Sequence, residues 1–573
     1  MEKTAPNLVL RRKFIQFLLP TLAIMALGPA EQIVESIFLA RRMGPQIMAS
    51  ASLASPFLLL ITAVYYYIGS GSVAEYTLAL NEGDEKQAGS TFRLTVQLAF
   101  LCGFLLTGLS ILFFDPLCLL HCRMPSLYDS FYTYFRVVIF TAPTMILFLT
   151  MTELLIPVGK PGFALLSVTL AGIMHIAMLF LFVDVLHLGI RGAALARLGS
   201  CVAGMLSAVS GVLLYAPRAR WSRVHISIRR LPAQIRSIVM RGNSEGLSVA
   251  AMAFRFFWTF SIVATTQSVD GVVAFSLCIL MASVDSIIQG TLIGTSMPLI
   301  ALLHEQADYR SAGRMLKHAM IVQFLLAALW FVFSNIIVRS LISYCGIQDE
   351  VDIRSTERIL FIYSLTYLFR GSYMLFRNYL KILNIRRIKQ MLLAAGFATN
   401  LLFMGFSRLG GEALWWSHPV LSLGLLLFTV MGNLAVARRS GGKWAGVLLI
   451  PQEQEALRTL NASMGLSREK IAGFAHKLQL LCTQYGMDAR RAALCAVAVE
   501  ELLLYVLEQK DRKDYADLFV RIYDDRTEID FRTLGTAFQP DEMALLRKIS
   551  PEILHRNIAG MNCTRLVIAG YRA

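Results

Sequence analysis

The sequence is poor in charged residues and in cysteine. Only 16% of its 573 residues are charged, against about 25% in an average soluble protein. Nine cysteines exclude a disulfide-rich scaffold, and the composition also excludes a collagen and a disordered chain. Apolar sequence is abundant instead, because hydrophobic residues make up 56% of the chain and the mean hydropathy is +0.58. These values exclude an ordinary soluble enzyme and predict a protein that lies mostly in lipid.

Long apolar runs fill the chain up to about residue 437 and then stop. Twelve membrane spans are predicted, at residues 14–39, 46–79, 91–114, 131–156, 161–186, 192–215, 243–268, 271–301, 316–341, 357–383, 388–407 and 413–437. The expected fold class is an α-helical membrane protein with twelve transmembrane helices in two six-helix bundles, plus a small cytoplasmic α/β sandwich domain. The predicted units are an N-terminal segment (1–13), a first bundle (14–215), a basic linker (216–242), a second bundle (243–437), a linker (438–462) and a cytoplasmic domain (463–573).

The net charge of +16 indicates membrane topology rather than a nucleic-acid partner. Most lysines and arginines outside the spans fall on the side of the N-terminus. The opposite loops hold only Arg41, Arg42, Arg123, Arg191, Arg339, Arg354, Arg358 and Arg408. The positive-inside rule therefore predicts a multi-pass protein of the cell membrane with both termini in the cytoplasm, in contact with membrane lipids.

The two predicted bundles resemble each other in sequence. The second span ends in Ile68-Gly69-Ser70-Gly71-Ser72 and the eighth ends in Ile293-Gly294-Thr295-Ser296. Each run is followed by a polar turn, containing Asp84 in one case and Asp308 in the other, about 224 residues apart. Parallel repeats of this kind are typical of transporters that alternate access to a site between two bundles.

Several short motifs resemble the multidrug and toxic compound extrusion (MATE) transporters. The resemblance depends on residues 35–44, Ala54-Ser55-Pro56, the Gly-Ser run at 69–72, Glu82-Gly83-Asp84, Gly159-Lys160-Pro161 and residues 189–196. It implies a twelve-helix antiporter, not an enzyme, that exports amphipathic and often cationic small molecules against Na⁺ or H⁺ without a cofactor.

Glu31 and Glu35 are the main candidates for an ion-coupling site. They are four residues apart in the first span, so they share one helix face with Gln32 close by. Two carboxylates in apolar surroundings disfavour each other's ionised form, as a proton-coupled or cation-binding site requires. The alternative interpretation places Glu31 near the water interface and gives Glu35 a structural partner. Glu35 occupies a position where MATE-like sequences usually have an aspartate.

Other charged or titratable residues in the spans depart from the family pattern. His175 and Leu179 stand where many family members have Asn and Asp, Met252 where some have a carboxylate, and Arg197 where a Thr is usual. His175 could take a proton or be a packing residue. The remaining charged residues are Glu153, Arg255, Asp285, Arg370 and Arg377, of which Asp285 and Arg255 are expected to form a pair. Such a pair would be structural or would change partners during transport.

Cysteines support a reducing compartment, because most lie in spans or in the cytoplasmic domain. Cys118 and Cys122, with His121 between them, are the exception, because they lie in a predicted outer loop. Unpaired thiols are the expected state, and a disulfide or a metal site is the alternative. No metal site is predicted elsewhere.

Beyond the basic junction at 438–442, the chain has the composition of a soluble domain. Helices are predicted at 467–485 and 488–509 and strands at 515–524, 527–534 and 564–569. This order resembles the histidine-kinase-like ATPase domain in its anti-sigma-factor-like form. The resemblance implies a nucleotide-like pocket at Glu501, Tyr505, Gly535, Phe538 and Asn562. Tyr505 stands where the family has its Mg²⁺-binding Asn, Thr533 stands in place of the adenine-binding Asp, and no glycine-rich lid is found. We therefore expect a degenerate regulatory or docking module, for which a cytoplasmic protein is a candidate partner, rather than an ATPase.

Three functions are consistent with this sequence. The first is a secondary antiporter whose substrate competes with an ion at Glu35. The second is a flippase for lipids or lipid-linked sugars, which the arginines in the spans leave open. The third is a sensor or scaffold that does not transport.

Overall fold

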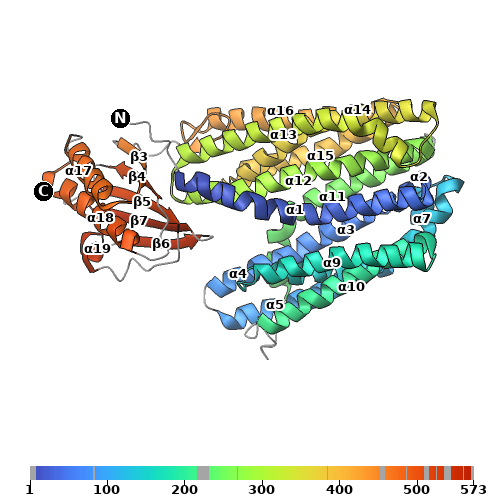
Figure 1. Ribbon diagram of the computed structural model, residues 1–573, viewed down its shortest axis with the longest axis horizontal. Helices are drawn as coiled ribbons and strands as arrows, with labels where there is room; N and C mark the ends of the chain where they lie inside the picture. The colour runs from blue at the N-terminus through green and yellow to red at the C-terminus, as the bar shows by residue number, and fades with distance from the viewer. Residues whose placement is uncertain are drawn as a thin grey trace.

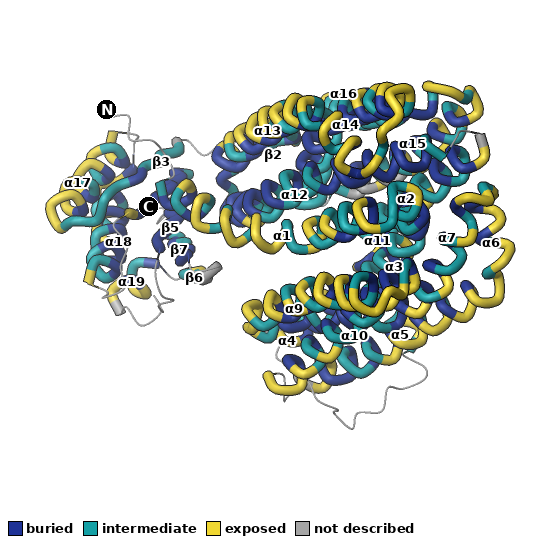
Figure 2. The backbone as a smooth tube through the Cα atoms, turned by 45° about the vertical axis from the view of Figure 1, so that its right-hand side comes forward, coloured by how far each residue is buried: buried dark blue, intermediate teal, exposed yellow. Residues whose placement is uncertain are grey.

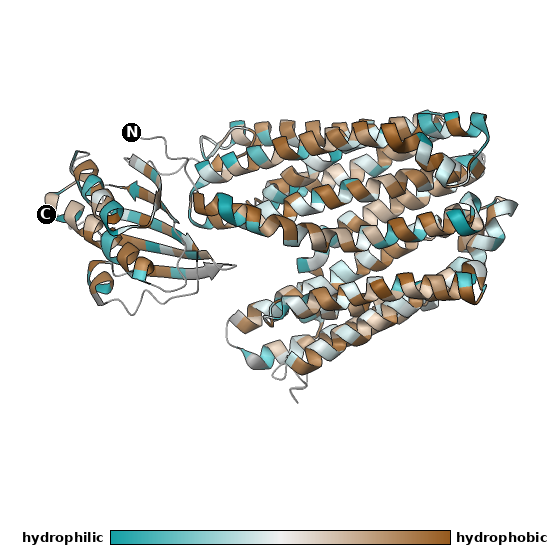
Figure 3. Cartoon of the chain, in the orientation of Figure 1, coloured by the Kyte–Doolittle hydropathy of each residue, from teal (hydrophilic) through white to brown (hydrophobic). Residues whose placement is uncertain are grey.

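The computed structural model shows a long helical bundle with a small α/β domain at one end (Figure 1). It describes residues 8–81, 84–215, 231–266, 269–383, 385–451, 458–484, 487–508, 515–523, 526–534, 544–550, 552–558 and 561–569. We call the α/β domain the tail, and the end of the bundle that it contacts the tail-side end. The bundle is mostly apolar on its surface, and the tail is mixed in hydropathy (Figure 3).

Helices of the bundle agree with the predicted spans. Among the described residues, 11 helices are long and apolar enough to cross a membrane, or 12 if the α7–α8 pair, bent by 51°, counts as one span. The first half consists of α1 (Leu8–Met43), α2 (Pro45–Ser52), α3 (Ser55–Tyr65), the π-helical turn η1 (Tyr66–Ser70), α4 (Gly71–Asn81), α5 (Glu85–Leu112), α6 (Phe114–His121), α7 (Pro125–Val138), α8 (Thr141–Leu154), α9 (Pro161–Phe180), the π-helical turn η2 (Leu181–Val185) and α10 (Gly189–Tyr215). The second half consists of α11 (Leu231–Thr266), α12 (Val269–Glu305), α13 (Tyr309–Tyr344), α14 (Glu350–Ile382), α15 (Arg386–Arg408) and α16 (Ala413–Arg439).

Two helices of the bundle begin inside segments predicted to lie outside both bundles. Helix α1 begins at Leu8, inside the predicted N-terminal segment 1–13. Helix α11 begins at Leu231, inside the segment 216–242 that the sequence predicted as a linker. Its first three turns carry Arg236 and Arg241 and therefore look like a basic loop. The residues before it, 216–230, lie outside the described part of the chain.

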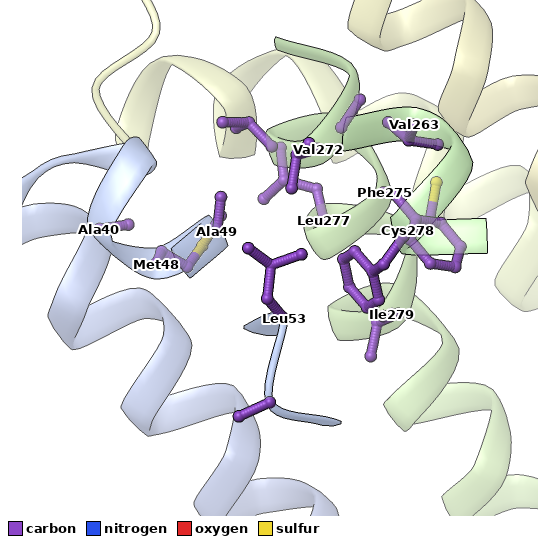
Figure 4. Packing of buried hydrophobic residues seen from close by; sticks show 14 of the residues in the cluster. Ala40, Met48, Ala49, Leu53, Val263, Val272, Phe275, Leu277, Cys278 and Ile279 are labelled. Atoms are coloured by element: carbon purple, nitrogen blue, oxygen red, sulfur yellow. The ribbon is translucent and has the colours of Figure 1, made fainter. Parts of the chain in front are cut away.

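The two halves pack together at the end away from the tail. Ala40, Met48, Ala49 and Leu53 of the first half lie close to side chains of α11 and α12, including Val263, Val272, Phe275, Leu277, Cys278 and Ile279 (Figure 4). Most buried backbone lies inside the two halves, and exposed residues follow their outer surface (Figure 2). This outer surface is mostly apolar. Its exposure to water would be unfavourable, but in a membrane it contacts lipid.

The internal repeat is visible in the helix caps. The Asp84 side chain accepts a hydrogen bond from the amide of Gln87 (2.9 Å) and begins α5. The Asp308 side chain accepts one from the amide of Ser311 (3.2 Å) and begins α13. The two turns thus have the same local structure in corresponding positions, as the sequence repeat predicts.

The tail is a five-stranded antiparallel sheet with helices on one face. The strand order is β3-β4-β5-β7-β6, and the hydrophobic core lies between the sheet and the helices α17 and α18. Its elements are β3 (Arg458–Gly465), α17 (Arg468–Gln484), α18 (Ala489–Glu508), β4 (Tyr515–Ile522), β5 (Arg526–Leu534), α19 (Ala544–Ile549), β6 (Glu552–Ile558) and β7 (Met561–Ala569), preceded by the short pair β1 (Trp444–Ala445) and β2 (Ile450–Pro451).

Both predicted tail helices and the three predicted strands are present, within one to three residues of their expected bounds. Strands β3 and β6 were not predicted. β3 begins at Arg458, inside the segment 438–462 that the sequence indicated as a linker. Its residues, RTLNASMG, include only one β-branched side chain, Thr459, and no aromatic one, so its place in the sheet depends on pairing with β4.

Candidate functional site

A compact cluster of ionisable side chains surrounds Glu35 inside the first half. The Arg197 guanidinium of α10 forms an ion pair with the Glu35 carboxylate, and Tyr134 of α7 donates its hydroxyl to Glu35 Oε1 at 3.1 Å. His175 of α9 bonds through Nδ1 to Glu31. Arg197 Nη1 also lies 3.6 Å from Glu31 Oε1. Four helices therefore contribute to one polar site.

The spacing of the sequence along α1 brings Glu31 and Glu35 to one side of the site. Glu31 and Glu35 lie one turn apart on α1, so both carboxylates lie on the same side of the helix. Only 6% of Glu35 and 1% of His175 are exposed, whereas the Glu31 side chain is 21% exposed. Glu35 thus lies inside the protein rather than toward lipid, and Glu31 lies nearer its surface.

The cluster carries one negative charge that a proton can neutralise. Two carboxylates and one guanidinium leave one negative charge when the imidazole is neutral and none when it is protonated. His175 Nε2 is buried without a hydrogen-bond partner among the described residues, and it lies 3.9 Å from Glu35 Oε1. A proton on this nitrogen would face the Glu35 carboxylate. Protonation of His175 would therefore neutralise the cluster.

Arg197 and Tyr134 were not among the site residues predicted from the sequence. Arg197 was noted only as a departure from the family pattern, although an arginine within a span by itself indicates a carboxylate partner. The structure gives Glu35 a partner in Arg197 and places Glu31 nearer the surface, which is the arrangement that the alternative interpretation of the sequence described. Nothing in the sequence around Tyr134 indicated its role.

Gln32 lies between the halves. Its Oε1 accepts a hydrogen bond at 3.3 Å from the Ser283 hydroxyl of α12. It is therefore the member of the predicted set that connects the carboxylates of α1 to the second half.

The predicted pair between Asp285 and Arg255 is wrong. Asp285 of α12 forms an ion pair with Arg370 of α14, at 3.6 Å between Oδ2 and Nη2, and also bonds to Gln289. Arg255 of α11 donates to the amide oxygen of Asn400 on α15, at 3.1 Å. Sequence spacing could not distinguish Arg255 from Arg370, because the choice depends on which helix packs beside α12.

Glu153 has neutral partners. The Tyr65 hydroxyl donates to one of its oxygens and Ser70 donates to the other at 3.1 Å. Tyr65 directly precedes η1, and Ser70 is its last residue. π-Helical turns of this kind often occur at functional sites. Tyr65 and Ser70 therefore satisfy both oxygens of the Glu153 carboxylate.

A cavity of about 590 Å³ lies near the end of α1 that is away from the tail. The Arg41 guanidinium lies 4.4 Å from the centre of the Tyr344 ring in its wall. The lining residues are Val34, Ile37, Phe38, Arg41, Arg42 and Tyr344. The cavity is therefore partly apolar and partly cationic.

The cysteine pair of the first half is not a metal site in this structure. Cys118 and Cys122 are both free and buried, and His121 instead bonds to the carbonyl of Leu53 (2.8 Å) and to Ser261 (3.0 Å). No group of three potential metal ligands occurs within the described residues. The structure agrees with unpaired thiols.

Only part of the nucleotide-like pocket can be placed. Glu501 and Tyr505 lie one turn apart on α18, and Tyr505 packs against the tail core. Asn562 is buried on β7. Gly535 and Phe538 lie outside the described residues. The ATPase resemblance remains a prediction.

Comparison with known proteins supports the MATE resemblance. The family model described as MatE matches residues 20–181, which lie in the first half. The chain is similar to an inward-facing multidrug resistance MATE family transporter of the MOP superfamily, with 17% identity, a TM-score of 0.61, and coverage of 71% of this chain and 93% of that one. It is also similar to an outward-facing transporter of this kind, with 15% identity, a TM-score of 0.57, and coverage of 77% and 100%.

A third similar structure is a MOP superfamily transporter from Pyrococcus furiosus, for which a reversed polarity of the binding pocket suggests a different function. It shares 15% identity with a TM-score of 0.56, and the match covers 77% of this chain and all of that one. No curated protein matches the chain significantly. Together these results show that the chain is a multi-pass membrane protein with the fold of the MATE transporters.

Proposed function

We propose that the chain is a MATE-family secondary antiporter that exports amphipathic or cationic small molecules by alternating access. The observation that carries this proposal is the buried cluster of Glu31, Glu35, His175 and Arg197, which lies inside a fold shared with such transporters. Ionisable groups are energetically unfavourable in a membrane-spanning bundle. Four of them in one cluster therefore indicate a functional site. The distribution of basic residues supports a cell-membrane location with both termini in the cytoplasm.

Between the two candidate coupling ions, we favour the proton. Na⁺ needs several oxygen ligands, and Arg197 already occupies the Glu35 carboxylate with a positive charge. A second cation at the same oxygens would be repelled by the guanidinium. A proton instead has a free acceptor in His175 Nε2. Proton binding and cationic substrate binding would then compete for the one negative charge of the cluster.

We expect Glu35→Gln to abolish proton-driven efflux. In proteoliposomes with an imposed pH gradient, the initial rate of efflux of a fluorescent organic cation should fall at least about tenfold, because the variant removes the charge on which proton and substrate compete. Glu412→Gln is the matched control, because Glu412 pairs with Arg358 and its side chain is 48% exposed. That variant should transport at the parent rate. Efflux that follows a Na⁺ gradient and ignores the pH gradient would contradict proton coupling.

Arginines of the second half favour a second candidate, a flippase for anionic lipids or lipid-linked sugars. Arg255 contacts Asn400, and Arg377 contacts Ser248 and the carbonyl of Ser244, all of which are neutral groups. Partly buried guanidinium groups with neutral partners suit an anionic headgroup. Translocation of a labelled lipid without efflux of organic cations would identify this function. If neither activity is found and a soluble protein co-purifies with the tail, the third candidate, a sensor or scaffold, would be favoured.

A further inference from the structure

The tail sheet has one apolar face and one charged face. In β4, Ala516, Leu518, Val520 and Ile522 belong to the core beneath the helices. The other face of the sheet carries most of its charge. Its charged residues on β4, β5 and β7 include Asp517, Arg521, Glu528, Asp530, Arg532 and Arg565, and Phe519 and Cys563 lie among them. Arg521 and Arg532 are nevertheless almost completely buried, at 0% and 1% exposed. A charged sheet face that is buried must have partners.

Some of these partners lie in the sheet, where Asp530 pairs with Arg521 (2.9 Å) and with Arg565 (2.8 Å). The others come from the turn between α12 and α13. Arg532 forms an ion pair with Asp308 (3.0 Å) and donates through Nε to the Gln306 side chain (2.6 Å). Arg521 donates to the carbonyl of Gln306 (2.7 Å), and Arg565 donates to the carbonyl of Glu305 (3.4 Å). The arginines therefore satisfy carbonyls at the C-terminus of α12, where the helix dipole favours positive charge.

The same face also caps the beginning of α1. The Asp517 carboxylate accepts hydrogen bonds from the amides of Val9 (3.0 Å) and Leu10 (3.3 Å), and Ser463 accepts one from Leu8 (3.3 Å). Burial raises the pKa of Asp517, although hydrogen bonds from Ser463 and from the two amides act in the opposite direction. The tail thus places a carboxylate at the N-terminus of α1 and guanidinium groups at the C-terminus of α12.

This contact distinguishes between the two internal repeats. Asp84, the counterpart of Asp308 in the first half, is exposed, whereas Asp308 is fully buried. Because the two turns have the same local structure, the difference comes from the tail. The tail therefore binds only one of two equivalent turns, together with a helix of the other half.

Helix α1 connects the halves along its length. At its tail-side end it lies so close to α12 that a Cβ on Gly294 would be 2.8 Å from Thr21 Cγ2, and one on Gly290 would be 3.0 Å from Met25 Sδ. Beyond Gly28-Pro29, Glu31 and Glu35 are bound to the first half. Pro29 removes one backbone hydrogen bond from the helix, and no side chain would meet a Cβ on Gly28. A bend at this position would therefore encounter little resistance.

We propose that the tail is a clamp that holds the first segment of α1, residues 8–27, against α12 and thereby restrains the bend at Gly28-Pro29. The clamp consists of the Arg532–Asp308 pair on one side and of Asp517 with the α1 amides on the other. A restrained bend fixes the positions of Glu31 and Glu35, which follow Gly28-Pro29 within two turns of α1. The tail thus controls the position of the helix that carries the candidate ion-coupling site, whatever the transported substrate is.

Cross-linking between α1 and α12 measures the clamp directly. The full chain carries Thr21→Cys and Gly294→Cys, positions whose side chains are within disulfide reach. A protease site is inserted within residues 216–230, so that a disulfide keeps two fragments together after cleavage. In membranes treated with a mild oxidant, adding Arg532→Asp should slow cross-linking at least about fivefold, because a like-charge pair replaces a buried ion pair. The reciprocal variant Arg532→Asp with Asp308→Arg should return the rate to within about twofold of the parent.

Four further variants complete the test. Asp84→Arg changes the equivalent but exposed turn and should leave the cross-linking rate unchanged. Asp517→Leu removes the acceptor for the α1 amides and should slow cross-linking, whereas Asp517→Asn keeps an acceptor oxygen and should not. Thr21→Cys alone identifies links formed by native cysteines. Parent-rate cross-linking in folded Arg532→Asp would overturn the clamp, and if that variant does not fold, parent-rate cross-linking in Asp517→Leu would do so. None of these measurements depends on transport.

Discussion

Arg197→Met is expected to lower the free energy of unfolding by about 3–5 kcal/mol, because it leaves the Glu35 carboxylate buried without its cationic partner. Methionine fills similar space, so the loss would come from charge rather than from packing. Thermal or denaturant unfolding of the purified protein in detergent measures this effect. In proteoliposomes the same variant should lose proton-driven efflux, because the charge balance of the cluster changes.

A rescue variant separates electrostatics from packing. Arg197→Met combined with Glu35→Gln removes both charges and should recover more than half of the lost stability. Arg191→Met on the same helix is the control, because Arg191 is exposed, and it should unfold like the parent. A stable Arg197→Met variant with an unstable double variant would show that Arg197 does not stabilise the buried carboxylate.

Gly242→Leu is expected to prevent correct packing of α11 against the second span. A Cβ at Gly242 would lie 2.1 Å from the carbonyl oxygen of Tyr66 and 2.8 Å from Tyr67 Cα. These are backbone atoms, so the helices themselves would have to separate. We expect a loss of more than about 3 kcal/mol or no accumulation of folded protein, since overpacking at an interface without flexible side chains cannot relax.

The matched control for this substitution is Gly424→Leu in α16, where no atom lies within 4 Å of the added Cβ. That variant should express and unfold like the parent. Expression level, gel-filtration profile and melting temperature compare the two. Normal behaviour of Gly242→Leu would mean that α11 does not contact η1 as closely as the structure shows.

Sequence patterns predicted most elements of this protein, because the spacing of apolar side chains along one segment indicates whether it forms a helix or a strand. Apolar runs indicated the spans, and the residue types at 515–524 and 527–534 indicated β4 and β5. The same reasoning failed at α11, whose first turns carry Arg236 and Arg241, and at β3, whose polar residues are strand-like only when paired with β4.

Predictions about partners were less successful. Glu31, Glu35 and His175 were identified as candidates from their cost in lipid, and the structure brings them together. The cost of a charge says that a partner must exist, but it does not say which one. Arg197 was therefore missed as the partner of Glu35, and Arg255 was chosen where Arg370 is the neighbour of Asp285.

By itself the sequence determined a membrane-embedded chain, its internal repeat, the carboxylates of α1 and, in the tail, two helices and three strands. Only the tertiary structure decided which charges neutralise one another and that the charged face of the tail covers Asp308 but not Asp84. The physical reason is that hydrophobic periodicity is read along one element, whereas an ion pair depends on how separate helices and strands pack. Two turns whose aspartates cap their helices in the same way can therefore have different environments.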